Sequence, residues 1–120
     1  MQNMEPFAPT GPEEEAVLLP LGSWEALGVS AGFTTRHAGN CALHTGDDPV
    51  AIIRRRERVA QTLGFSLDAW VCGEQVHGNQ VAIARRSDAG RGSRSRAAAF
   101  PDTDALISDE SDLLLVQFFA

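Results

Sequence analysis

The strongest constraint on the fold is a strand-like run near the C-terminal end that is almost wholly apolar. Residues 113–119 read Leu-Leu-Leu-Val-Gln-Phe-Phe. A strand that is apolar on both faces is normally covered on both faces, which is typical of inner strands in α/β proteins. We therefore expect other parts of the protein to cover both faces of this strand. Where this strand lacks cover, we expect an exposed apolar edge that favours self-association.

One amphipathic helix is expected from Pro49 to Leu63. Asp48 can accept hydrogen bonds from free backbone N–H groups, Pro49 suits the first helical position, and Gly64 is a C-terminal stop. The apolar stripe of this helix is formed by Ile52, Ile53, Val59, Ala60 and Leu63. Arg56 falls inside the stripe, and two interpretations are open. Either its stem lies along the apolar surface with the guanidinium in water, or the guanidinium forms a buried ion pair.

Shorter runs rich in β-branched, aromatic and apolar residues surround this helix. They cover residues 16–19, 29–35, 70–76, 81–84 and 104–108. Gly78 and Asn79 predict a tight turn that joins 70–76 to 81–84 as a hairpin. Residues 109–112 predict the turn between the last two strands. Because side chains alternate along a strand, Cys72 should face away from His77 and be a small buried hydrophobe rather than a nucleophile.

Other segments lack a strand or helix period. Residues 1–15 carry three prolines and an acidic run, and they are expected to be a disordered tail that precedes a folded part from 16 to 120. Ser23 is expected to cap a single helical turn that ends at Gly28. Residues 88–100 are rich in Gly, Ser and Arg, which predicts a mobile surface loop.

Composition narrows the function. A chain of 120 residues forms one domain at most, and its 43% hydrophobic residues are ordinary for a globular protein. The net charge of −6 disfavours a nucleic-acid binder that relies on a positive field. Two cysteines are too few for a disulfide scaffold, and no hydrophobic signal segment is visible. We expect a reduced, cytoplasmic protein with neither a nucleic-acid nor a membrane partner.

Among the three histidines, His77 has the clearest chemical setting. It follows a strand-like run and precedes the predicted turn. A histidine at such a place can hold a metal, move a proton or bond nearby backbone, and the residues alone leave these roles open. Residues 36–45 form a second candidate region, because this patternless loop contains Arg36 and His44 and loops often carry function.

Five motifs in order resemble the laccase-domain family, which is described both as multicopper polyphenol oxidases and as purine nucleoside phosphorylases. They are Ala31–Arg36, Leu43–Pro49, the helix with Arg56 and Arg58, Glu74–Gly78, and Thr103–Leu106. The resemblance runs from about residue 17 to the end. It implies an α/β fold with layered β-sheets flanked by helices, of which this chain supplies the N-terminal half.

The resemblance also implies a zinc site. In the family, the metal is held by the histidine of a Gln-Val-His-Gly motif, by a cysteine after an Ala-Asp pair, and by a later histidine. His77 matches the first ligand, whereas Cys41 and Cys72 match neither of the others. By the same resemblance, His77 is the catalytic and metal-binding residue, and Arg36, His44 and Gln75 are substrate-binding candidates for phosphate or ribose.

The family reaction is attack of phosphate on a purine nucleoside such as adenosine or inosine, and adenosine deamination is also associated with members. Copper-dependent phenol oxidation is the older alternative, and it ranks lower because multicopper sites need many histidines. Because only one of three ligands is found, we expect this chain to be inactive alone. The competing interpretation is a truncated, non-catalytic binding module or remnant.

Overall fold

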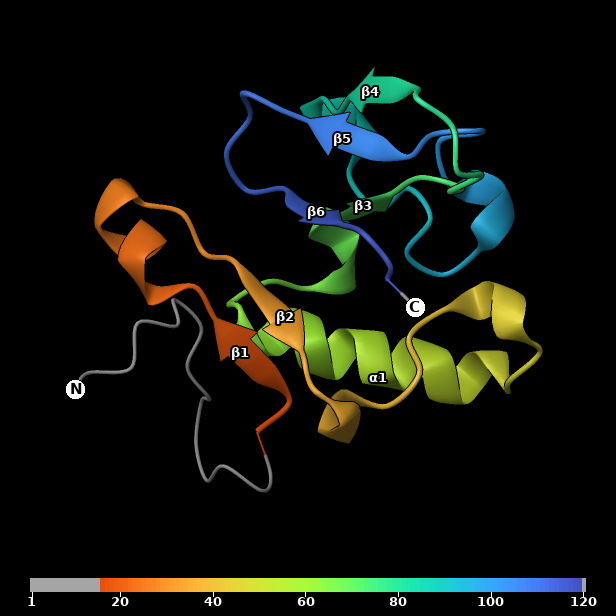
Figure 1. Ribbon diagram of the computed structural model, residues 1–120, viewed down its shortest axis with the longest axis horizontal. Coiled ribbons are helices and arrows are strands. Elements are labelled where there is room, and N and C mark those ends of the chain that lie inside the picture. The colour runs from red at the N-terminus through yellow and green to blue at the C-terminus, as the bar shows by residue number, and fades with distance from the viewer. Residues whose placement is uncertain (1–15, 120) are drawn as a thin grey trace.

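The computed structural model describes residues 16–119, so the predicted tail at 1–15 lies outside the described residues. Within that range the chain is α/β, as predicted, with three two-stranded sheets and one α-helix (Figure 1). The strands are β1 (Leu18–Pro20), β2 (Gly32–Thr34), β3 (Trp70–Cys72), β4 (Val81–Ile83), β5 (Ala105–Ile107) and β6 (Leu114–Val116). The helix is α1 (Pro49–Thr62). Short 3-10 turns connect them: η2 (Gly22–Leu27), η3 (Arg36–Ala38), η4 (Leu43–Thr45), η5 (Leu67–Ala69), η6 (Arg86–Asp88) and η7 (Arg96–Ala98).

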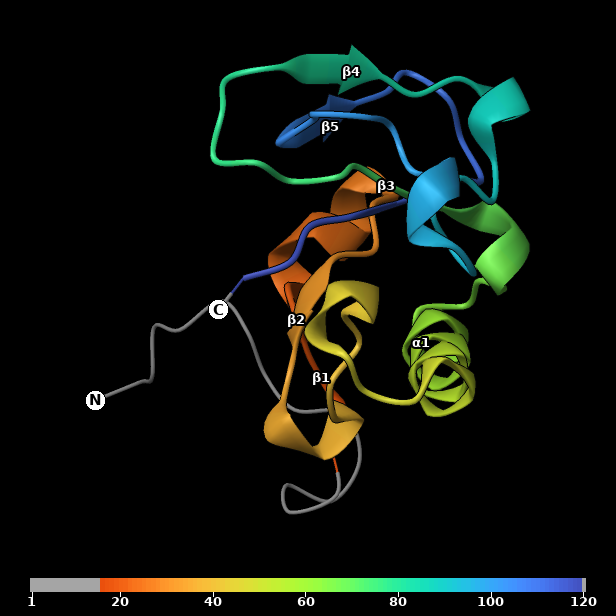
Figure 2. The same ribbon diagram turned by 90° about the vertical axis from the view of Figure 1, so that its right-hand side faces the viewer.

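The three sheets lie one after another along one direction in space. Figures 1 and 2 both show the β4–β5 sheet at one end, the β3–β6 sheet in the middle, and α1 with the β1–β2 sheet at the other end. No helix of the described residues is long and apolar enough to cross a membrane.

Helix α1 begins and ends as the sequence predicts. The Asp48 carboxylate accepts a hydrogen bond from the Val50 N–H at 3.2 Å, and Pro49 is the first helical residue. After Thr62, Gly64 takes a positive φ of 82°, which glycine adopts without steric cost. The turn at η2 is different, since Leu21 rather than Ser23 precedes it and gives no side-chain cap. Its stop at Gly28 is confirmed.

The predicted hairpin between residues 70–76 and 81–84 is wrong. Strand β3 pairs in parallel with β6, and β4 pairs in parallel with β5. The turn predicted at 109–112 does not make a hairpin either, because β5 and β6 belong to different sheets. Among the strands of residues 16–119, only β1 and β2 form an antiparallel pair, with Leu19 opposite Phe33. Residues 76–78 belong to no strand, and their backbone N–H groups bond to a side chain, as described below.

The last strand is shorter and less covered than its composition predicts. Leu114 is buried, but Leu115 is 37% exposed and Phe119 is 75% exposed. The prediction that the strand at 113–119 is covered on both faces is therefore wrong for the described residues. The reason is that the run leaves the sheet after Val116, where the backbone of Phe118 bonds to the side chain of Gln75 instead of a strand.

Two apolar clusters make the core, and α1 contributes to both. The first contains Ala60, Leu67, Trp70, Cys72, Ala99 and Leu114. The second contains Val17, Leu18, Ala38 and Val59. Cys72 is 3% exposed, which confirms that it is a small buried residue.

The prediction of a mobile surface loop at residues 88–100 is wrong for part of the segment: residues 94–98 are exposed, but others are packed inside. Ser93 and Ala99 are buried, and Gly92 packs directly on Cys72. The carbonyls of Gly92 and Ser93 accept hydrogen bonds from the guanidinium of Arg56, at 2.7 and 2.9 Å. Glycine and serine are small enough to let the chain approach this buried cation, so the composition that predicts mobility instead permits close packing.

Candidate active site

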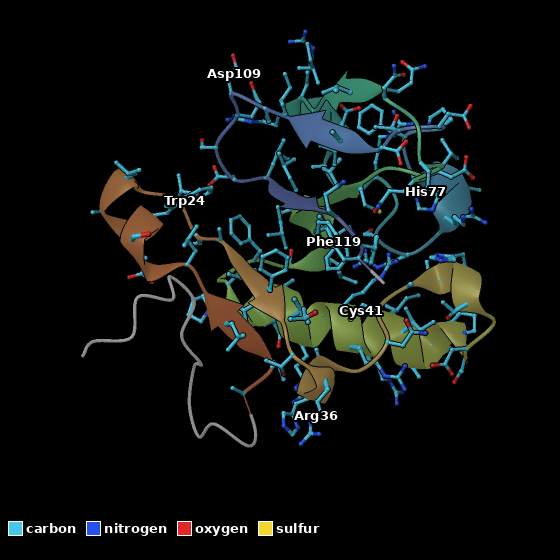
Figure 3. The ribbon with its side chains drawn as sticks, in the orientation of Figure 1. Trp24, Arg36, Cys41, His77, Asp109 and Phe119 are labelled. Carbon is cyan, nitrogen blue, oxygen red and sulfur yellow. The ribbon has the colours of Figure 1, made fainter. Side chains whose placement is uncertain are left out.

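A cavity of about 860 Å³ lies between β2, the loop that contains η4, α1 and the ends of β3 and β6. His77, Gln75 and His44 all line it, although they come from separate segments. Figure 3 shows His77, Phe119 and Cys41 along the region between the upper sheets and α1. The cavity therefore brings together three of the four residues that the sequence selects.

His77 occupies an exposed bend after β3, with its backbone in the left-handed region at φ 60°. A residue with a Cβ adopts this conformation at a cost of roughly 1 kcal/mol or more, so other contacts must hold it. The bend turns the chain away from the sheet, which leaves the imidazole on the cavity wall rather than in the core.

The carboxylate of Asp104 supplies those contacts. Its Oδ1 accepts hydrogen bonds from the N–H groups of Val76 at 3.0 Å and His77 at 2.9 Å, and its Oδ2 accepts one from Gly78 at 2.7 Å. Desolvation alone would raise the pKa of this carboxyl. The three N–H donors, with the nearby His77 charge, outweigh that effect and hold the Asp104 pKa below its usual range.

Gln75 is held on the other side of the same bend. Its Nε2 donates to the Phe118 carbonyl at 2.9 Å, and its Oε1 accepts from the Phe118 N–H at 2.8 Å. The amide thus pairs with the backbone as a neighbouring strand would. This pair fastens the His77 segment to the residues that follow β6.

His44 and Arg36 differ in their relation to the cavity. His44 lies in η4 and is exposed on the cavity wall. Arg36 begins η3 and is exposed, but it does not line this cavity. Figure 3 shows Arg36 at the lower edge of the molecule, below α1, whereas His77 lies above α1. The structure does not bring Arg36 to the other three residues.

Arg56 is a cavity residue that both sequence interpretations missed. Only 2% of it is exposed, and its guanidinium donates to the carbonyls of Cys41, Gly92 and Ser93 at 2.7 to 2.9 Å. The guanidinium also lies 5.0 Å from the ring centroid of Trp70. Its head is neither in water nor in an ion pair with a carboxylate among the described residues. Burial lowers the pKa of Arg56.

The thiols of Cys41 and Cys72 lie close enough to Arg56 to interact with its positive charge. Burial raises the pKa of Cys72, although contacts with Trp70 and Arg56 oppose this. Burial also raises the pKa of Cys41, against the charges of Arg56 and Arg55. Both cysteines are free thiols, and raised pKa values keep them protonated near neutral pH.

Two further features of the cavity were not expected from the sequence. Arg96 in η7 pairs with Glu74 at 3.7 Å, and both side chains line the wall. The rings of Phe33 and Phe119 meet at a centroid distance of 5.7 Å and an angle of 56°. The apolar run at 113–119 was a visible signal for Phe119, but nothing in the sequence pattern pairs it with Phe33.

The metal that the resemblance implies finds one ligand here. No group of three His, Cys, Asp or Glu side chains that could hold a metal occurs among residues 16–119. A zinc site normally needs three or four such ligands. The described residues therefore do not by themselves fit a zinc ion, and His77 is a single candidate ligand.

Comparison with known proteins places the chain in a family. Residues 23–120 match the family described as multi-copper polyphenol oxidoreductase laccase. The chain belongs to this laccase family. A family relative from Geobacillus stearothermophilus named purine nucleoside phosphorylase YlmD is 41% identical over 111 residues, which are 85% of this chain and 40% of the relative. A purine nucleoside phosphorylase of Corynebacterium glutamicum is 34% identical over 97 residues, which are 73% of this chain and 37% of that protein.

Solved structures agree with this laccase-family fold. The Bacillus licheniformis hypothetical protein YfiH superimposes with a TM-score of 0.83 at 29% identity, over 92% of this chain and 42% of that one. The structure of YlmD from Geobacillus stearothermophilus gives a TM-score of 0.69 at 33% identity, over 96% and 42%. The chain thus spans less than half the length of the relatives that it matches.

Proposed function

We propose that this chain is part of a purine nucleoside phosphorylase and that its cavity contributes to the binding of a purine nucleoside and phosphate. The observation that carries the proposal is the meeting of His77, Gln75 and His44 on one cavity wall. The names of the relatives support the reaction class. In this reaction an oxygen of phosphate attacks C1′ of the ribose, the glycosidic C–N bond breaks, and the base leaves with the bonding electrons.

We assign the residues as follows. His77 is the catalytic residue and one ligand of a zinc ion, and the remaining ligands come from segments outside this chain. His44 contacts phosphate or ribose in the same cavity. Gln75 is a substrate-binding residue, because its amide keeps one N–H and one oxygen lone pair beyond the two bonds to Phe118. Arg36 acts on substrate only if η3 faces another part of the complete site.

Copper-dependent phenol oxidation is the second candidate, and the family description supports it. It remains the weaker one, because multicopper sites need many histidines and only His77 and His44 of the three line the cavity. The two free thiols, Cys41 and Cys72, fit a reduced compartment, so we place the protein in the cytoplasm.

A chimera tests the proposal. Residues 16–120 replace the matched region of YlmD from Geobacillus stearothermophilus, and phosphorolysis of inosine and adenosine is measured together with bound metal. The chimera should release base and ribose 1-phosphate, whereas the 120-residue chain should not. His77→Ala in the chimera should lower both turnover and metal content, because one missing ligand weakens the whole site.

The matched control is His37→Ala, which removes a histidine that does not line the cavity. It should leave turnover and metal content unchanged. Ammonia release from adenosine and oxidation of a phenol with added copper are measured in the same preparations. The proposal is wrong if the chimera keeps its turnover after His77→Ala. It is also wrong if the chimera oxidises phenol without phosphorolysis.

A further inference from the structure

One carboxylate bonds to all three residues of the bend that carries His77, residues 76–78. Asp104 lies directly before β5, far along the chain from His77, and it accepts hydrogen bonds from three consecutive N–H groups at 2.7 to 3.0 Å. Hydrogen bonds to an ionised acceptor are about twice as strong as those between neutral groups. One side chain thus satisfies the donors of Val76, His77 and Gly78 together.

These bonds hold a backbone that would not adopt its conformation unaided. His77 has a φ of 60°, which is unfavourable for a residue with a side chain. A Cβ added at Gly78 would lie 3.3 Å from Asp104 Oδ2, so the carboxylate fits closely against the bend. The direction of the imidazole follows from these backbone angles, because the Cα–Cβ bond is fixed by them.

The backbone of Asp104 is itself held by hydrogen bonds on both sides. Its N–H donates to the Gln80 carbonyl at 3.1 Å, and its carbonyl accepts a hydrogen bond from Gln117 Nε2. The next residue, Ala105, begins β5 and lies opposite Val81 of β4. Asp104 is therefore fixed by its position next to the β4–β5 sheet, whereas residues 76–78 belong to no strand. The sheet, through Asp104, holds the bend in place.

We propose that Asp104 is a positioning residue, which fixes the backbone of residues 76–78 and so directs the His77 imidazole into the cavity. Its catalytic consequence rests on the proposed function, since that assigns the chemistry to His77. The placement of the bend itself is independent of the reaction and can be measured without it.

The first experiment uses the 120-residue chain and follows backbone amide exchange and the imidazole signals of His77 by NMR. In Asp104→Ala all three bonds are lost. In Asp104→Asn one acceptor oxygen remains, and an NH2 group faces the donors on the other side. We expect exchange at Val76, His77 and Gly78 to rise about 10-fold or more, with shifted imidazole signals and the larger effect in Asp104→Ala.

Asp109→Asn is the matched control, because Asp109 is exposed in the β5–β6 connection and Figure 3 places it away from His77. It should change neither signal. Amides of α1 report on global stability in the same spectra. If Asp104→Ala loses protection throughout α1, the near-isosteric Asp104→Asn decides. Unchanged exchange and imidazole signals in Asp104→Asn, with α1 still protected, overturn the proposal.

The second experiment places the same substitutions in the chimera. Asp104→Asn should lower kcat on the order of 100-fold with KM near its original value, because misplacing a reacting group by about 1 Å costs that much. Asp109→Asn should keep full turnover. If His77→Ala lowers turnover and Asp104→Asn does not, Asp104 is not a positioning residue. If His77→Ala has no effect, the proposed function fails, and the exchange experiment still decides on Asp104.

Discussion

At the scale of single residues, the buried guanidinium of Arg56 has the largest predicted effect on stability. It satisfies carbonyls from two loops, at Cys41 and at Gly92 and Ser93, and it lies against the Trp70 ring. A buried polar group without a partner costs about 1–3 kcal/mol. Removing Arg56 leaves three carbonyl oxygens without this donor and a gap beside Trp70.

Arg56→Met should therefore lower the free energy of unfolding by about 3 kcal/mol, measured by urea denaturation. Arg56→Lys should recover only part of this, because one ammonium cannot reach all three acceptors with the geometry of a guanidinium. Arg54→Met, on the exposed face of the same helix, should stay within about 0.5 kcal/mol of the original chain. Equal stability of Arg56→Met and Arg54→Met would contradict this account.

A second residue, Asp47, links stability to pH. Hydrogen bonds from Arg55 at 2.9 Å and from the Asp48 N–H hold the Asp47 pKa below its ordinary value. A carboxyl whose pKa is lower in the folded state adds stability above its unfolded pKa of about 3.9, and this is lost as the pH falls through the folded pKa. Asp47→Asn should therefore be less stable than the original chain at pH 7.

That difference should vanish near pH 2, where the carboxyl is protonated in both states. Urea unfolding from pH 2 to pH 7 measures it, with Asp109→Asn as a control that keeps the pH dependence of the original chain. High salt should reduce the effect, because the pair is exposed. A stability difference that is constant with pH would contradict the assignment.

At the scale of elements, segment 88–100 shows how a glycine permits packing. Gly92 has a φ of 77°, and a Cβ at this position would lie 2.6 Å from Cys72 Sγ and 2.9 Å from the Ala99 Cβ. Gly92→Ala therefore combines backbone strain with overpacking of the core, and we expect a loss of about 2–3 kcal/mol in the free energy of unfolding.

Gly90→Ala is a useful comparison, since Gly90 also has a positive φ of 90° but only a contact at 3.6 Å. It should carry the strain without the clash and destabilise less, by about 1 kcal/mol. Limited proteolysis should cleave Gly92→Ala within residues 88–100 faster than the original chain. If both variants behave alike, packing on Cys72 is not what orders this segment.

Elements with local signals could be predicted from the sequence, and their partners could not. Asp48, Pro49 and Gly64 define the ends of α1 because capping and positive φ are local properties. The hairpin predicted across Gly78 and Asn79 failed because strand composition does not reveal which strand is the partner. A parallel pair such as β3–β6 joins segments whose contact no local pattern records.

The same division applies to the candidate site. The motif around His77 identified the bend, but the role of Asp104 depends on a contact between distant segments. The environment of Arg56 was missed for a related reason. An arginine within an apolar stripe normally extends to water, and only the folded chain shows two loops presenting carbonyls to it.

At the scale of the whole molecule, apolar side chains remain at the surface beside the cavity. Phe119 is 75% exposed and Leu115 is 37% exposed on the segment that runs through β6. Contiguous exposed apolar surface favours association. We predict concentration-dependent self-association of the 120-residue chain through this segment, measured by sedimentation velocity.

Phe119→Ser should shift the population toward monomer. Leu27→Ser, at an equally exposed apolar residue in η2, should not. Both variants should keep the far-ultraviolet circular dichroism of the original chain. A chain that stays monomeric at all concentrations, or that responds equally to both substitutions, would show that this surface does not drive association.

The parallel pairing of β3 with β6 has a consequence for synthesis on the ribosome. Trp70 acquires its strand partner only after Leu114 has been added and has left the exit tunnel. At about 5–20 residues per second, this leaves an apolar strand without its neighbour for several seconds. Helix α1 and the β1–β2 pair can form earlier, because their contacts are closer in sequence. The nascent chain should therefore be most exposed to chaperones between the emergence of β3 and that of β6.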